Sequence, residues 1–261
     1  MDYKKVVSLL TILCLAFCSK SFAQTTPWKS CIGGRERFII QPTDKPCEYI
    51  SAIEVELYPG WKSFWRNPGS SGMKPEINVD NGKATILYPT PVLYKQQDNE
   101  WENIYTDHLL LPVKISSTDK CNNISGNLHV CFCKNMCIPV ELQFNFTNIT
   151  SNLLEQYIID QAFAGLPKEH SKNISFKAIK QTPQGIQIVY SYKNIDPKKI
   201  ELFLDAGDKF CSLPILISKN NHHLIFETKC SKLIKGANLF YTLKTDTETI
   251  SNIIKLNSRN F

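Results

Sequence analysis

The residues best suited to chemistry lie close together near the middle of the chain. Nine consecutive residues include one histidine, three cysteines and one methionine: His129, Cys131, Cys133, Met136 and Cys137. Cysteine thiolates exchange with disulfides and also bind soft metal ions. No Ser-His-Asp order, glycine-rich phosphate loop or paired-carboxylate motif stands out elsewhere in the 261 residues. We therefore expect the chemistry of this chain at its cysteines.

Two cysteines of this cluster flank a three-residue loop. Cys133 and Cys137 enclose Lys134-Asn135-Met136. If the loop turns a hairpin, the two cysteines face each other with Cα atoms about 4.5–5.5 Å apart, within disulfide reach. So small a ring gives little entropic stabilisation, exposed bridges are the exchangeable ones, and Lys134 favours a thiolate. We predict a redox-active Cys133–Cys137 pair, with an inert staple as the alternative.

The same cluster supports two other hypotheses. The soft ligands suit Cu(I), which predicts a copper-binding or copper-tolerance protein that uses His129, Cys131, Cys133, Met136 and Cys137. Copper binding needs thiolates and hence the reduced state. In the other hypothesis, the chain is a non-catalytic binding module in which the cysteines only staple the fold.

The start of the chain is typical of a cleaved export signal. Residues 1–23 combine a basic start with 12 mostly apolar residues, Val6–Phe17, and small residues before a cleavage site at Gln24. Twelve residues are too few to span a bilayer, and no later segment is long and apolar enough. Cleavage removes Cys14 and Cys18 and leaves eight cysteines, an even number that suggests disulfides in an oxidising compartment.

One disulfide follows from strand register. A hairpin that turns at Asn220-Asn221 pairs residues whose numbers add up to 441, so Lys219 faces His222. Cys211 and Cys230 also add up to 441 and therefore lie opposite each other. We predict a structural disulfide between them.

The remaining pairings rest on weaker arguments. Cys31 and Cys47 bracket a segment before the first clear strand, where a bridge would contribute about 3 kcal/mol. Cys121 is the remaining partner for Cys131, which leaves Cys133–Cys137 as a separate pair. A Cys131–Cys133 bridge is strained and less favoured. We therefore predict Cys31–Cys47 and Cys121–Cys131 as structural disulfides.

The elements that position these cysteines are predicted to be strands. Short β-branched and aromatic runs between Pro, Gly and Asn indicate an all-β fold. The expected strands are Ile50–Tyr58, Lys83–Tyr88, Leu109–Ser116, Asn127–Cys133, Ile138–Phe146, Ser175–Gln181, Gly185–Tyr192, Lys199–Leu204, Leu213–Lys219, His222–Lys229, Leu239–Lys244 and Thr249–Leu256. Seven short strands in the second half fit an immunoglobulin-like sandwich.

One helix interrupts the strands. Ser151 can cap it, Leu154, Ile158 and Ala162 recur at fourfold spacing, and a glycine and a proline end it by Pro167. We predict two immunoglobulin-like β-sandwich domains, residues 24–150 and 168–261, joined by a short helix over 151–167. The formal charge of +6 is scattered without a basic block, so nucleic-acid binding has no support.

The first half resembles the N-terminal periplasmic (alpha) domain of DsbD-type and ScsB-type thiol:disulfide interchange reductases. Four ordered motifs carry the resemblance, and the end of the helix also fits. They are Leu57–Gly72, close to that family's "PGWKTYWRNPGDSG", Tyr88–Pro91, Ile104–Val113 and Val130–Pro139, similar to "VCxxxCIP". Trp61 and Trp65 lie in the first motif and are interpreted as packing residues.

The resemblance implies an immunoglobulin-like domain with a redox cysteine pair on a hairpin. In that family the pair takes electrons from a membrane-embedded partner and passes them to thioredoxin-like proteins in the periplasm of Gram-negative bacteria. Carried over to this chain, Cys137 attacks and Cys133 resolves, and no cofactor is required. The chain departs from the family by lacking a transmembrane domain and by carrying Cys121 and Cys131. We therefore expect a separate membrane-embedded electron donor.

Overall fold

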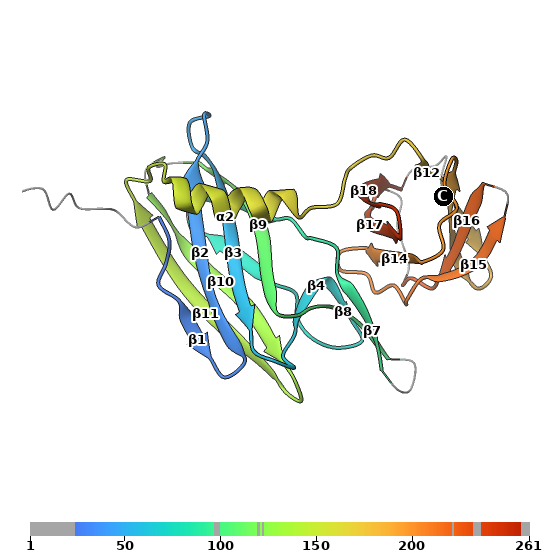
Figure 1. Cartoon of the computed structure of the whole chain (residues 1–261), viewed down its shortest axis with the longest axis horizontal. Coiled ribbons are helices and arrows are strands. Elements are labelled where there is room, and N and C mark those ends of the chain that lie inside the picture. The colour runs from blue at the N-terminus through green and yellow to red at the C-terminus, as the bar shows by residue number, and fades with distance from the viewer. Residues whose placement is uncertain are drawn as a thin grey trace, which may run out of the picture.

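We describe a computed structural model, which places residues 24–96, 100–118, 121, 123–220, 222–231 and 236–256. The predicted signal peptide, residues 1–23, lies outside these residues. The described chain is mostly β, with one helix across one face of the first group of strands (Figure 1). The predicted all-β character is confirmed, whereas the immunoglobulin-like topology and the exact domain limits stay predictions.

The first β unit contains three antiparallel sheets. The largest has the order β1 (Lys29–Cys31), β2 (Gly34–Pro42), β3 (Glu48–Leu57), β9 (His108–Ser117) and β6 (Gly82–Ile86). The second has the order β11 (Cys137–Thr147), β10 (Asn123–Cys133) and β5 (Glu76–Val79), and the third β4 (Ser63–Gly69), β8 (Trp101–Tyr105) and β7 (Val92–Lys95). Alternate side chains of the first two sheets, such as Phe38, Leu128 and Phe144, share one buried core.

The helix packs on the first unit instead of forming a free connection between the two units. α2 (Leu153–Ala164) lies across β2, β3 and β9, where Ile159 and Ala162 contact Ile39 and Ala52 (Figure 1). Asn152 caps it in place of the predicted Ser151, because the Asn152 side chain accepts bonds from two backbone N–H groups.

The helix face predicted as apolar is only partly buried. Leu154 is 80% exposed, whereas Ala162 from the same stripe is buried. The buried face is centred on Ile159. The cap and the packing on the sheet rotate the helix about its axis, so that the stripe of Leu154, Ile158 and Ala162 does not face the sheet along its whole length.

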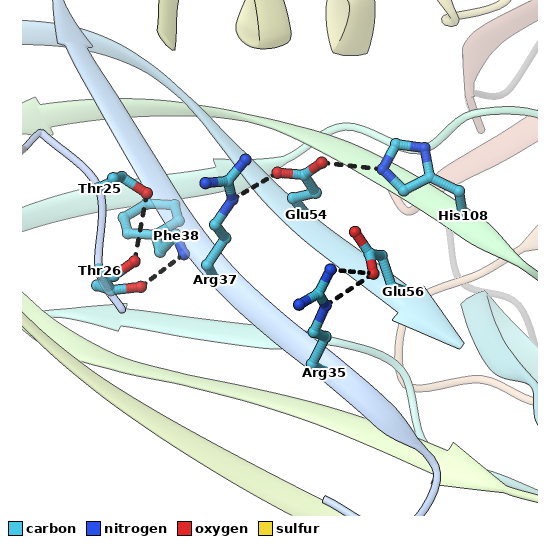
Figure 2. Close-up of polar contacts among 8 residues, drawn as sticks. All are labelled: Thr25, Thr26, Arg35, Arg37, Phe38, Glu54, Glu56 and His108. Atoms are coloured by element: carbon cyan, nitrogen blue, oxygen red, sulfur yellow. Dashed lines mark hydrogen bonds and ion pairs between the residues drawn. The ribbon is translucent and has the colours of Figure 1, made fainter. Parts of the chain in front are cut away.

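Beyond the helix, the outer face of this sheet carries charged cross-strand pairs. Arg35 lies directly opposite Glu56 and Arg37 opposite Glu54, and each pair forms an ion pair at 2.7 and 2.6 Å (Figure 2). The His108 ring lies 3.0 Å from the other oxygen of Glu54. Opposite charges directly across an antiparallel pair stabilise its register. These contacts on the outer face therefore stabilise the register of β2, β3 and β9.

The second β unit is built from two antiparallel sheets. One has the order β12 (Ile174–Thr182), β13 (Gly185–Tyr192), β16 (His223–Thr228) and β15 (Ile215–Asn220), and the other β14 (Ile200–Asp205), β17 (Asn238–Thr245) and β18 (Thr249–Lys255). Tyr190, Phe226 and Tyr241 pack edge to face between them. This unit has its own buried core.

Strand β4 joins the two units. The Trp65 ring packs edge-on against Phe203 at 6.0 Å, and the Asn67 side chain donates to the carbonyl of Leu204 at 2.7 Å. Trp65 is 1% exposed, so its interpretation as a packing residue is confirmed. The second unit therefore rests against a strand that lies within the first family-like motif, Leu57–Gly72.

The hairpin of Cys211 and Cys230 pairs these cysteines as predicted, although most of it has another register. Lys219 pairs with Leu224 and not with His222, two residues from the predicted register. The register shifts by one residue between Leu216 and Ser218 and by one more before the cysteines. The paired residue numbers therefore add up to 441 again at Cys211 and Cys230. Cys211 then faces Cys230 with Cα atoms 3.9 Å apart, and the predicted disulfide is confirmed.

Two other predicted disulfides are wrong. Cys47 bonds to Cys121, with Cα atoms 4.4 Å apart, and Ser117 beside them donates its N–H to the Cys47 carbonyl. Cys31 cannot reach Cys47 because the nine residues of β2 lie between them, at about 3.3 Å each. Strand β10 separates Cys121 from Cys131 in the same way. Cys31 and Cys131 carry free thiols.

Candidate functional site

The hairpin of β10 and β11 holds the predicted redox pair. Cys133 is the last residue of β10 and lies directly opposite Cys137, the first residue of β11. Their Cα atoms are 4.1 Å apart and their sulfur atoms form a disulfide. The predicted hairpin pairing is therefore confirmed. The loop between them places this bridge at the tip of the hairpin.

The two cysteines of the bridge differ in exposure. Cys133 is 2% exposed, and Cys137 lies on the exposed side of the hairpin. The backbone of Cys133 is fixed by two hydrogen bonds of 2.8 Å with Lys62, one in each direction. The Cys137 sulfur is therefore the reachable one, and the Cys133 sulfur is held inside.

A third cysteine lies beside the bridge. Cys131 is on the same face of β10 as Cys133, and their sulfur atoms are 3.5 Å apart. The sulfur atoms of Cys131, Cys133 and Cys137 all lie within 4.8 Å of one another. Phe64 and Ile104 pack against the inner two cysteines. Burial in this apolar environment raises the pKa of the Cys131 thiol.

A buried ion pair borders the site. The Lys62 ammonium bonds to the Glu102 carboxylate, which also accepts a hydrogen bond from the Ser71 hydroxyl. The side chains of Lys62 and Glu102 are 16% and 2% exposed. Sequence reasoning missed this pair and singled out Lys134. The Lys134 side chain lies beside Gly60, where an added Cβ would be 3.3 Å from the Lys134 amino group. The first family-like motif contains Lys62, but only the fold brings Glu102 to it.

Exposed apolar side chains lie on the hairpin tip and on two neighbouring loops. Met136 at the hairpin tip is 70% exposed, Ile32 is 69% exposed and Tyr58 is 46% exposed. These residues come from three adjacent loops, since the Tyr58 N–H donates to the Gly33 carbonyl and the Lys134 side chain occupies the space where a side chain on Gly60 would begin. The exposed Cys137 therefore lies beside an apolar rim formed by Met136, Ile32 and Tyr58.

Behind the hairpin, a cleft of about 630 Å³ lies between the two units. Its wall includes Cys131 and His129 of β10, with Asp205, Lys209 and Phe210 from the second unit. The cleft therefore borders the inner side of the cysteine cluster at Cys131, which is itself 1% exposed.

The structure brings together only part of the predicted copper ligands. The three cysteine sulfurs are grouped, but His129 does not join them, and Met136 is exposed on the loop. Two of the three sulfurs are bonded to each other in this state. The copper hypothesis stays a prediction that concerns the reduced chain only.

Comparisons with known proteins agree with this geometry. Residues 36–148 match the family model described as "Thiol:disulfide interchange protein DsbD, N-terminal". No curated protein matches the sequence at a significant level. Among solved structures, the N-terminal periplasmic domain of ScsB from Proteus mirabilis has a TM-score of 0.77 at 21% identity, over 90% of this chain and 99% of that one. A conserved domain protein from Bacillus anthracis overlays with a TM-score of 0.25 at 10% identity, over 91% of this chain and 94% of that one, and supports no conclusion.

The structural similarity extends beyond the segment matched by the family model, because it covers both β units. The family model itself ends after β11, and the matched segment contains Cys131, the Cys133–Cys137 bridge, and the Lys62–Glu102 pair. The matched residues 36–148 belong to the N-terminal domain family of the thiol:disulfide interchange protein DsbD.

Proposed function

We propose that this chain is a protein thiol–disulfide oxidoreductase that relays electrons through Cys133 and Cys137. The observation that carries the proposal is a hairpin-tip disulfide with one exposed and one buried cysteine, in a segment of the DsbD N-terminal family. Exposed bridges are the exchangeable ones, whereas structural bridges resist reduction.

The exchange needs the bridge in its reduced form. The Cys137 thiolate attacks one sulfur of a partner disulfide, a mixed disulfide forms, and the other partner sulfur leaves as a thiolate. The Cys133 thiolate then attacks the Cys137 sulfur, which releases the second partner thiolate and restores the bridge. Two electrons have passed from this chain to the partner. The fixed backbone of Cys133 keeps the resolving sulfur beside Cys137.

The rim supports a protein as the partner. Met136, Ile32 and Tyr58 offer exposed apolar area on the hairpin tip and the loops next to it. We propose thioredoxin-like proteins as acceptors and a separate membrane-embedded protein as donor, in the periplasm of a Gram-negative bacterium. The similarity to a periplasmic ScsB domain supports this location. No helix among the described residues is long and apolar enough to cross a membrane.

Trapping tests the proposal directly. The Cys133→Ala variant lacks the resolving thiol, so it is expected to accumulate a Cys137-linked mixed disulfide with a thioredoxin-like protein. The matched Cys137→Ala variant retains only the buried Cys133 at this pair and is expected to trap little or none. If neither substitution traps a partner, the exchange role is wrong and the binding-module hypothesis takes its place.

A further inference from the structure

The exchange proposed above leaves one buried thiol of the cluster without a role. Cys131 is 1% exposed, and its sulfur lies 3.5 Å from that of Cys133, within hydrogen-bond distance for sulfur. In the oxidised chain the Cys133 sulfur is bonded to Cys137 and carries no hydrogen. The hydrogen between the two atoms therefore belongs to Cys131, whose S–H is the donor.

The sequence and the fold both fix this contact. Residues two apart on a strand share one face, so Cys131 and Cys133 point the same way from β10. Phe64 and Ile104 cover them from the third sheet and limit their contact with water. The Lys62 backbone pairs with that of Cys133, but the Lys62 ammonium is bound by Glu102.

We propose that Cys131 is a positioning residue that donates its S–H to the Cys133 sulfur and stabilises the thiolate that this sulfur becomes when the bridge is reduced. The inference rests on the proposed function and names a residue that regulates the same site. Reduction places two electrons in the bridge, and negative charge then develops on Cys133 in an apolar environment. A donor at this atom lowers the free energy of the charged form.

Cys131 is suited to donate because it retains its proton. Burial raises the pKa of this thiol, which favours its protonated form, and Cys131 forms no disulfide, so its S–H is present beside Cys133. The contact therefore favours the dithiol form over the disulfide. It also favours the Cys133 thiolate that resolves the mixed disulfide.

The test is the redox equilibrium of the full chain with glutathione at pH 8, read by alkylation and mass mapping of Cys133 and Cys137. Cys131→Ala removes the donor and is expected to shift the equilibrium toward the disulfide by a factor of about three to ten. Cys131→Val also lacks a donor but fills the space of the cysteine side chain. It therefore tests the same prediction if the alanine variant does not fold. Cys131→Ser keeps a donor and is expected within a factor of about two of the parent.

The other free cysteine is the matched control. Cys31 accepts a hydrogen bond from the Gly33 N–H and does not belong to the sulfur group, so Cys31→Ala is expected to leave the equilibrium unchanged. The proposal is overturned if Cys131→Val equals the parent, if the serine and valine variants shift alike, or if mapping finds Cys131 itself bonded. Because glutathione replaces the protein partner, these results are independent of the trapping experiment, whose failure would count against the exchange role alone.

Discussion

The two β units each bridge an antiparallel pair of strands, but the surroundings of the bridges differ. Cα atoms lie 4.1 Å apart at Cys133–Cys137 and 3.9 Å apart at Cys211–Cys230. Cys137 is exposed and a free thiol lies beside its partner, whereas Cys211 is 1% exposed and Cys230 is half-buried. Backbone geometry therefore does not distinguish a reactive bridge from a staple. We propose that exposure and a neighbouring thiol make the difference.

The interiors of the two units differ as well. Among the described residues, the buried carboxylates Glu36, Glu54 and Glu102 all lie in the first unit, whereas the buried polar side chains of the second unit are threonines. Glu54 and Glu102 have cationic partners, but neither oxygen of Glu36 has a hydrogen-bond partner. Buried charge is costly unless it is paired. The unit that holds the Cys133–Cys137 bridge therefore also holds a buried carboxyl group without a hydrogen-bond partner.

The largest expected effect concerns activity. Cys137→Ser removes the attacking thiol and is expected to reduce disulfide-reductase activity by about 10³-fold or more, as is usual when a nucleophile is lost. The double variant Cys211→Ser/Cys230→Ser removes the other hairpin bridge and is expected to retain activity within a factor of about two. Insulin reduction by the prereduced chain measures both. Equal losses in the two variants would contradict the difference between the bridges.

The next effect concerns stability. The Cys47–Cys121 bridge spans 74 residues, Cys211–Cys230 spans 19 and Cys133–Cys137 spans 4. Loop entropy predicts contributions of about 4, 3 and 2 kcal/mol in that order. Urea unfolding of paired Cys→Ser variants is expected to reproduce this order. A larger loss at Cys133–Cys137 than at Cys47–Cys121 would show that the reactive bridge is itself structural.

A smaller effect depends on pH and on the buried carboxyl in β2. Desolvation raises the pKa of Glu36 to about 8 in the folded chain, from an ordinary value of 4.5. The unfolded chain ionises first, so the stability present below about pH 4.5 falls as the pH rises toward 8. Glu36→Gln is expected to flatten this profile and to raise the free energy of unfolding at pH 8 by on the order of 3 kcal/mol.

An exposed glutamate provides the control for that profile. Glu141 lies on the exposed face of β11, so Glu141→Gln is expected to leave the pH dependence of urea unfolding unchanged. If the Glu36 variant keeps the parent's fall in stability between pH 4.5 and 8, the cause is another group.

Local patterns in the sequence predicted the hairpins better than the contacts between them. All twelve predicted strands form, because each is a short apolar or β-branched run with a turn at its end. Six strands of the first unit were missed: β1, β2, β4, β5, β7 and β8. In β2 the outward Arg35 and Arg37 and the buried Glu36 hide the apolar alternation. Local register correctly predicted Cys133–Cys137, whereas Cys211–Cys230 was predicted from a register that holds at the cysteines but not along most of their hairpin.

The remaining cysteines depend on contacts that register cannot predict. Cys47–Cys121 joins two connections that meet only when β2, β3, β9 and β10 are folded to full length. Pairing leftover cysteines therefore gave two wrong bridges. The same pairing assigned Cys131 to a bridge, so the contact of its free thiol with Cys133 was missed. The two-residue spacing of Cys131 from Cys133 was the signal that placed both on one strand face.

The central claim is that the bridges of the two units differ in redox behaviour. The measurement is disulfide mapping of the full chain equilibrated in glutathione and dithiothreitol buffers of graded potential. We expect Cys133–Cys137 to be reduced at a potential above roughly −300 mV while Cys211–Cys230 stays oxidised there, as structural bridges do. If both bridges are reduced together, or if Cys133–Cys137 requires a potential below roughly −300 mV, the hairpin-tip bridge is a staple and the account is wrong.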